Sequence, residues 1–214
     1  MDKDQIKAEA KTLFETKGAL AAAAYLADTL FADVTDKAGA PYTGHLYRVA
    51  ADIADYHIKP IGYLHDVIED VAGWDADDLY DIGFDEYTVD GVIGVTRNWG
   101  EPYFDFIVRC GQTPQSIPVK RSDLKDNSNI LRMPKLPDAE DIARLKKYLL
   151  SEYYLKDVQT GVIKAGTEFG VWMKSQPKEM HDWHIFAENS SEPNPATRKY
   201  IHHQGKIHRT WSLG

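Results

Sequence analysis

Four short stretches of the sequence carry side chains of the types that bind divalent metal ions. In chain order these are His45, the adjacent pair His65 and Asp66, the pair Glu69 and Asp70, and Asp123. Imidazole nitrogen combined with carboxylate oxygen suits Mn, Fe or Zn better than Ca. An ion held by such ligands generates hydroxide near neutral pH and promotes its attack on a phosphate ester. The residue types and spacing therefore predict a metal site and a class of reaction.

The segment 60–71 has the periodicity of an amphipathic helix. One arc is apolar and contains Ile61, Leu64, Val67, Ile68 and Val71. The opposite arc holds His65, Asp66, Glu69 and Asp70, with no Lys or Arg among them. These acidic side chains repel one another, and a bound dication would relieve the repulsion. The alternative interpretation is an ordinary surface helix with a charged outer face.

The remaining candidate ligands lie in two other amphipathic stretches. His45 begins the stretch 45–54, after a turn at 41–44 in which Thr43 is a candidate helix cap. Asp123 and Asn127 share a face of the stretch 119–127. Each has a structural alternative, because a single histidine often satisfies a local hydrogen bond and Asp123 could cap a helix. The four stretches taken together, in this order, favour a single site.

Several runs resemble the RelA/SpoT-type alarmone hydrolases. The runs 36–45, 63–70 and 119–127 are similar to the entry segment, the HD-ED helix and the last ligand helix of that family. The segments 95–97 and 101–109 resemble the middle helix of its small, single-domain members. The resemblance implies a mainly α HD-type phosphohydrolase domain, a helical bundle, at residues 1–156. The family removes pyrophosphate from the 3′ position of guanosine tetra- or pentaphosphate.

The resemblance also assigns roles to individual residues. It implies that one divalent metal, usually Mn(II), is held by His45, His65, Asp66 and Asp123. Glu69 and Asp70 match the pair that orients and deprotonates the attacking water. Lys37 matches a basic residue beside the nucleotide, and Asn127 a residue near the ribose or its phosphate. Arg97 and Lys120 lie in the motif segments and are candidates for binding phosphate, and Tyr42 could stack on a base or pack in the core. Fe, Zn, Ni or Mg are alternatives to Mn(II).

The chain departs from the family at three positions. Asp36 stands where the family has a cation, Leu46 where proline is usual, and Asp126 where the long synthetase-hydrolases have histidine. The change at Asp36 keeps other substrates open, namely a nucleoside triphosphate or NADPH acted on by a phosphatase. A catalytically silent nucleotide sensor, or an antitoxin-like binding protein, is the alternative outside the enzymes.

Composition restricts the classes of partner. The 214 residues are 43% hydrophobic and carry a formal net charge of −8, which argues against a duplex nucleic-acid surface. The single Cys110 excludes an intrachain disulfide and is typical of a reducing compartment. The charged start and the lack of about 20 consecutive apolar residues predict a cytoplasmic protein without a membrane partner. The expected partner is a small nucleotide, and a homo-oligomer is left open.

Periodicity and turn signals predict a helical chain as far as about residue 156. The expected helices are 4–16, 18–31, 45–57, 60–71, 76–81, 85–97, 101–110, 123–131 and 138–156, with Asp75 and Asp138 at helix starts. Glycines and β-favouring runs at 168–173 and 182–187 then predict a change of character. A hairpin is expected around Gln204 and Gly205. Residues 157–214 are therefore predicted to form a small β-rich appendage of unknown role.

Overall fold

Helices make up the regular structure of the computed structural model, which describes residues 1–36, 39–133 and 135–188. No strand occurs within these ranges, and the only β pairing there is an isolated bridge between Thr35 and Pro41. The elements are α1 (Lys3–Lys17), α2 (Ala19–Leu30), α3 (Thr43–Asp52), α4 (Lys59–Leu64), α5 (Val67–Asp70), α6 (Ala76–Ile82), α7 (Glu86–Val95), α8 (Tyr103–Cys110), α9 (Ser116–Asn127), the 3₁₀ helix η1 (Ile130–Arg132), α10 (Ala139–Gln159), α11 (Phe169–Lys174) and α12 (Lys178–Glu188). The predicted mainly α class is confirmed.

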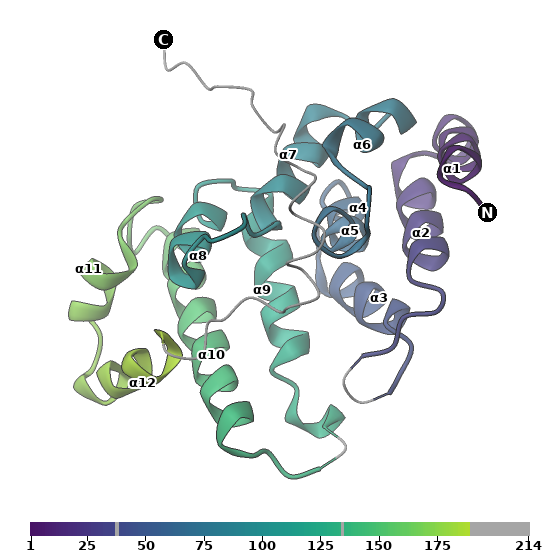
Figure 1. Cartoon of the computed structure of the whole chain (residues 1–214). Helices are drawn as coiled ribbons and strands as arrows, with labels where there is room; N and C mark the ends of the chain where they lie inside the picture. Colours follow the sequence, from purple (N-terminus) through teal and green to yellow (C-terminus); the bar gives the residue numbers. More distant parts are fainter. Residues whose placement is uncertain (37–38, 134, 189–214) are drawn as a thin grey trace.

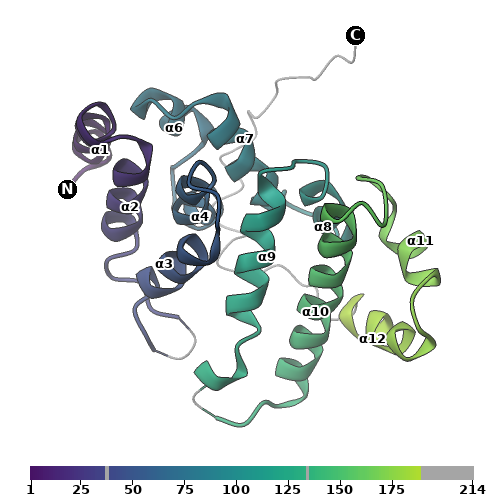
Figure 2. The same ribbon diagram turned by 180° about the vertical axis from the view of Figure 1, so that it is seen from behind.

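The helices are arranged roughly in chain order across the molecule. The helices α1 and α2 lie at one end, α11 and α12 lie at the other, and α9 and α10 stand side by side between them (Figure 1). The short helices α3 and α4 lie between α2 and α9, as the reverse view also shows (Figure 2). Segments far apart in the sequence, α3, α4 and α9, therefore meet near the middle of the fold.

Two clusters of buried apolar side chains form the core of the described chain. One joins α1 to α7 and includes Leu26, Leu46 and Leu64. The other joins α8 to α12 and includes Tyr154 and Trp172. Helix α9 contributes to both, since its Val119 belongs to the first cluster while Ile117 and Leu124 belong to the second. Burial on both sides fixes the backbone of α9 in place.

Aspartate capping explains where several helices begin. Asp2, Asp75 and Asp138 each accept a hydrogen bond from the N3 backbone N–H, and the N3 side chain reciprocates in a capping box. The predicted helix starts at Asp75 and Asp138 are confirmed. Thr43, a candidate cap in the sequence, is instead the first residue of α3, whose N-cap position is Tyr42 without a side-chain cap.

The single helix expected at 60–71 is wrong, because the chain breaks between α4 and α5 at His65 and Asp66. His65 Nδ1 lies 2.8 Å from the carbonyl oxygen of Gly62, a group that a continuous helix would bond to the backbone N–H of Asp66. Gly62 also lets α4 approach α3 closely, since a Cβ there would lie 2.9 Å from Cα of Ala50. Both candidate ligands therefore lie at the junction of two short helices.

Two other helices depart clearly from their predicted bounds. The helix expected at 45–57 ends at Asp52, and the side chain of Asp55 accepts a hydrogen bond from the backbone N–H of His57 in the following turn. The helix expected at 123–131 begins earlier, at Ser116, because Pro118 lies in its first turn, where no helical hydrogen bond is lost. The residues up to Arg132 continue as η1.

The predicted β-rich appendage is wrong for the part that the structure describes. The run 168–173 lies mostly in α11, and 182–187 lies in α12. Phe169, Trp172 and Met173 are spaced for one face of a helix, and all three are buried against α8 and α10. The β propensity of the run was therefore overridden by packing. The hairpin expected around Gln204 and Gly205 lies outside the described residues.

Within the described ranges, no helix combines the length and the apolar character needed to cross a membrane.

Candidate metal centre

The four predicted metal ligands come together between α3, α4 and α9. His45 lies in the first turn of α3, His65 and Asp66 lie at the break between α4 and α5, and Asp123 lies in α9. His45 Nε2 is 3.4 Å from Asp123 Oδ1 and 3.8 Å from Asp66 Oδ2. His65 Nε2 is 3.0 Å from Asp66 Oδ2 and 3.8 Å from Asp123 Oδ1. Residues nearly 80 positions apart therefore direct nitrogen and oxygen atoms toward one point.

The two imidazoles are buried and their outer nitrogens are fixed by hydrogen bonds. His45 is 3% exposed and His65 is 2% exposed. A carbonyl can only accept, so the bond between His65 Nδ1 and Gly62 places the proton on Nδ1. His65 Nε2 is buried and makes no hydrogen bond of good geometry, although Asp66 Oδ2 lies 3.0 Å away. A buried imidazole nitrogen that faces two carboxylates is the arrangement expected of a metal ligand.

The carboxylates strongly influence protonation of the two histidines. Burial by itself would lower the pKa of His45, but the side chains of Asp123 and Asp126 outweigh it and raise the pKa to about 10. The pKa of His65 is also raised, because Asp66 outweighs the effect of burial. Burial would raise the pKa of Asp123, whereas Lys120 and His45 lower it. Without another cation, this group of side chains therefore holds protons that a metal ion would displace.

The residues present fit a divalent transition-metal ion. His45, His65 and Asp123 each offer one ligand atom, and these atoms lie within 4.8 Å of one another. Asp66 lies outside this group of three, but its Oδ2 is 3.0 Å from His65 Nε2 and 3.8 Å from His45 Nε2. A mixture of imidazole nitrogen and carboxylate oxygen suits Mn, Fe or Zn. The two inward-facing Nε2 atoms and the surplus of carboxylates both favour a cation at this point.

Glu69 and Asp70 lie beside the ligands, in α5. Burial raises the pKa of Glu69, although Lys120 opposes this, and Glu69 Oε2 accepts a hydrogen bond of 3.0 Å from the backbone N–H of Arg97. Burial, followed by the charges of Asp66 and Glu69, raises the pKa of Asp70 to about 8. Asp70 is one of the more exposed residues of the site, and water screens part of this effect. A raised pKa makes the ionised carboxylate a stronger base, and a cation bound nearby would favour the ionised form.

These side chains line one cavity of about 610 Å³. Of the predicted site residues, it is lined by Tyr42, Asp66, Glu69, Asp70, Arg97, Lys120, Asp123 and Asn127. The buried rings of His45 and His65 contact the carboxylates of Asp66 and Asp123. The predicted substrate residue Lys37 lies outside the described residues. The volume is within the range of small-molecule sites in proteins, roughly 300–1,000 Å³.

Several predicted substrate-binding residues support the metal ligands directly. The Tyr42 hydroxyl donates to Asp66 Oδ2 at 2.6 Å, and its ring stacks on Phe31. Lys120 Nζ donates to Asp123 Oδ2 at 2.8 Å, and Asn127 donates to Asp123 Oδ1. Lys120 and Asn127 together satisfy both oxygens of Asp123. These three side chains therefore orient the carboxylates, in addition to facing the cavity.

The guanidinium group of Arg97 closes the loop after α7. It donates to the main-chain carbonyl of Glu101, at 2.8 Å from Nε, and lies 5.8 Å from the ring centre of Tyr103. Its backbone N–H holds Glu69, as described above. Arg97 thus lines the cavity and holds Glu69 through its main chain.

The sequence analysis missed cations that the structure brings to the same cavity. Arg132 comes from η1, Lys135 from the segment that follows it, and Arg144 and Lys147 from α10. Positive charge is concentrated in this part of the sequence, between 132 and 147, and that was the available signal. Arg132 contacts both Asp36 and Asp126, so a cation lies directly beside Asp36. The sequence also did not predict that Asp126 contacts the His45 ring, with 2.7 Å between Oδ2 and Nδ1.

Comparison of the sequence with known protein families found no matching family model, and comparison with curated proteins found no match.

Proposed function

We propose that this protein is an HD-type, metal-dependent phosphohydrolase that acts on a phosphorylated nucleotide. The preferred reaction is removal of the 3′-pyrophosphate from guanosine tetra- or pentaphosphate. The observation that carries the proposal is the convergence of two imidazoles and two carboxylates beside a cavity that also contains two carboxyl groups of raised pKa. The resemblance of the motif segments to alarmone hydrolases supplies the substrate.

His45, His65, Asp66 and Asp123 would hold the ion, with Mn(II) as first choice. When bound, it would lower the pKa of a water molecule and neutralise charge on the phosphoryl group. Tyr42, Lys120 and Asn127 orient the carboxylate ligands through their hydrogen bonds. The protein thereby fixes the site before the substrate arrives, which lowers the reorganisation needed during the reaction.

Glu69 and Asp70 would take the proton from the attacking water. Glu69 is oriented by the backbone of Arg97, and Asp70 lies on the same short helix next to it. Their raised pKa values make the ionised carboxylates stronger bases, and the charge of a bound ion would keep them ionised near neutral pH. The remaining negative charge of the substrate requires cations, and Arg144 and Lys147 of α10 line the cavity together with Lys120.

A panel of nucleotides tests the proposed substrate. Purified protein with Mn(II) is incubated with guanosine tetraphosphate, nucleoside triphosphates and NADPH, and the products are separated and quantified. The proposal predicts pyrophosphate and guanosine diphosphate from guanosine tetraphosphate, and no product after chelation of the metal. Release of phosphate or triphosphate from another nucleotide would instead identify that nucleotide as the substrate. Nucleotide binding without turnover across the panel would contradict an enzyme and favour a sensor.

A further inference from the structure

Helix α9 contacts both nitrogens of the His45 ring. Asp123 Oδ1 lies 3.4 Å from Nε2, and Asp126 Oδ2, three residues later on the same helix, lies 2.7 Å from Nδ1. The side chain of Asp126 is 8% exposed, so this contact is shielded from water. The imidazole is therefore held between two carboxylates. Asp123, a candidate metal ligand, faces Nε2, and Asp126 contacts the outer nitrogen Nδ1.

The contact with Asp126 determines which nitrogen of His45 can bind a metal. An ionised carboxylate only accepts, so the proton of the ring lies on Nδ1 when the ring is neutral. The lone pair of Nε2 then faces Asp66 and Asp123. A carboxylate that binds the outer nitrogen of a metal-binding histidine fixes its tautomer and its orientation, and makes it a stronger ligand.

Two arginines hold Asp126 in place. Arg48 Nε donates to Asp126 Oδ1 at 2.6 Å, and Arg132 forms an ion pair with Asp126 Oδ2. Arg132 also pairs with Asp36, which connects η1 to the segment before α3. Charge-assisted bonds on both oxygens keep the carboxylate ionised and stationary. If the carboxylate were removed, two guanidinium groups would remain near His45 and would oppose a bound dication.

We propose that Asp126 is a positioning residue that directs Nε2 of His45 toward the metal centre, with Arg48 and Arg132 as its supports. The inference rests on the proposed metal-dependent function, and it adds a residue that acts through His45 without contacting the substrate. Removal of such a carboxylate typically weakens metal affinity 10–100-fold.

Metal affinity of the full chain tests this role without relying on turnover. The affinity of wild type, Asp126→Ala and Asp52→Ala for Zn(II) and Mn(II) is measured by isothermal titration calorimetry. Asp52 is a matched control, because its ion pair with Lys125 also joins α3 to α9 but does not involve His45. We expect roughly 10–100-fold weaker binding in Asp126→Ala and wild-type affinity in Asp52→Ala. Equal affinity in Asp126→Ala and wild type would overturn the proposal.

A spectroscopic measurement separates positioning from a general structural effect. In the diamagnetic Zn(II) form, the Nδ1 proton of His45 should give a slowly exchanging NMR signal in wild type and Asp52→Ala. The signal should be lost in Asp126→Ala, and its persistence there would contradict the assignment. If Asp126→Ala does not fold, the isosteric Asp126→Asn replaces it in the affinity measurement, with weaker binding than wild type expected because the amide keeps the hydrogen bond but not the charge. Wild-type protein that binds neither metal would overturn both the proposed function and this inference. Metal binding by wild type with the same affinity in Asp126→Ala would overturn only the inference.

Discussion

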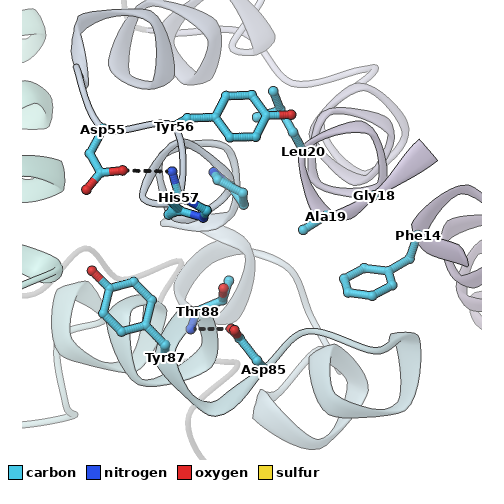
Figure 3. A pocket seen from close by; sticks show the side chains of 11 residues that line it. Phe14, Gly18, Ala19, Leu20, Asp55, Tyr56, His57, Asp85, Tyr87 and Thr88 are labelled. Carbon is cyan, nitrogen blue, oxygen red and sulfur yellow. Dashed lines mark hydrogen bonds between the residues drawn. The ribbon is translucent and has the colours of Figure 1, made fainter.

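Two cavities in the described part of the chain lie beside histidine and aspartate residues, but only at one of them do these side chains come together as potential ligands. The second cavity, of about 500 Å³, is lined by Asp55, His57 and Asp85 together with Tyr56 and Tyr87 (Figure 3). There Asp55 accepts from the backbone N–H of His57 and Asp85 accepts from that of Thr88, as the dashed lines in Figure 3 show. These carboxylates cap turns and helices. In the metal centre, the carboxylates face imidazole nitrogens.

The comparison shows that residue types alone do not define a site. Asp55 and His57 are close in sequence, whereas His45 and Asp123 are far apart, yet only the second pair is buried with its polar atoms converging. What distinguishes the metal centre is burial, together with hydrogen bonds that occupy the outer nitrogens of the histidines. Matched substitutions in the two cavities test this difference.

The largest expected effect is loss of metal binding in Asp66→Ala. Asp66 supplies an oxygen near both imidazoles, so its removal should abolish binding of the ion and with it all turnover. The matched change in the second cavity, His57→Ala, should leave both intact. Metal content after dialysis and product release are measured on the same samples. Retained metal and activity in Asp66→Ala would remove the distinction between the two cavities.

Glu69→Gln should separate metal binding from catalysis. The amide keeps the shape of Glu69 and can still accept from the backbone N–H of Arg97, but it cannot take a proton. We expect kcat to fall by roughly 10²–10⁴-fold with the metal content unchanged, since that is the usual contribution of a general base. Glu86→Gln, in α7 beside the second cavity, is the control. Full activity in Glu69→Gln would exclude Glu69 as the base.

Metal affinity should increase with pH. The pKa of His45 is raised to about 10 in the metal-free protein, so binding of a cation at neutral pH must displace its proton. Affinity is therefore weakest at low pH and strengthens as the pH rises toward 10, by roughly tenfold per pH unit for each proton displaced. Calorimetry between pH 6 and 8, in buffers of different ionisation enthalpy, gives the affinity and the number of protons released. Affinity that does not depend on pH would contradict the raised pKa.

The smallest expected effect belongs to the second cavity. Asp85 is the N-cap of α7 and accepts from the backbone N–H of Thr88 at 2.9 Å. Asp85→Ala should lower the free energy of unfolding by about 1 kcal/mol, as loss of a helix cap usually does. Urea denaturation measures this change, and metal affinity should stay at the wild-type value. A loss of metal affinity in Asp85→Ala would mean that the second cavity is not separate from the metal centre.

The candidate ligands could be selected from the sequence because their types and order carry the chemistry. Local signals were also sufficient for the capped starts of α6 and α10 at Asp75 and Asp138. The break at His65 was not predicted, because the contact of its side chain with the carbonyl of Gly62 and the close packing of α4 on α3 leave no mark in the periodicity. Periodicity alone indicated one continuous helix there.

Two further features depended on tertiary contacts. The role of Asp126 requires the register of α9 against α3, which no local pattern reveals. The run 168–173 was interpreted as β-favouring because of its aromatic and branched residues, but Phe169 and Trp172 are buried on one face of α11. In both cases the deciding contact joins residues that are distant in the sequence or lie on different helices.

Anomalous X-ray diffraction from crystals grown with Mn(II) tests the central claim most directly. The account predicts one strong anomalous peak between His45, His65, Asp66 and Asp123, and none in the cavity that contains His57. A peak at another position, or no peak at saturating Mn(II), would contradict the metal centre and the hydrolytic function that depends on it.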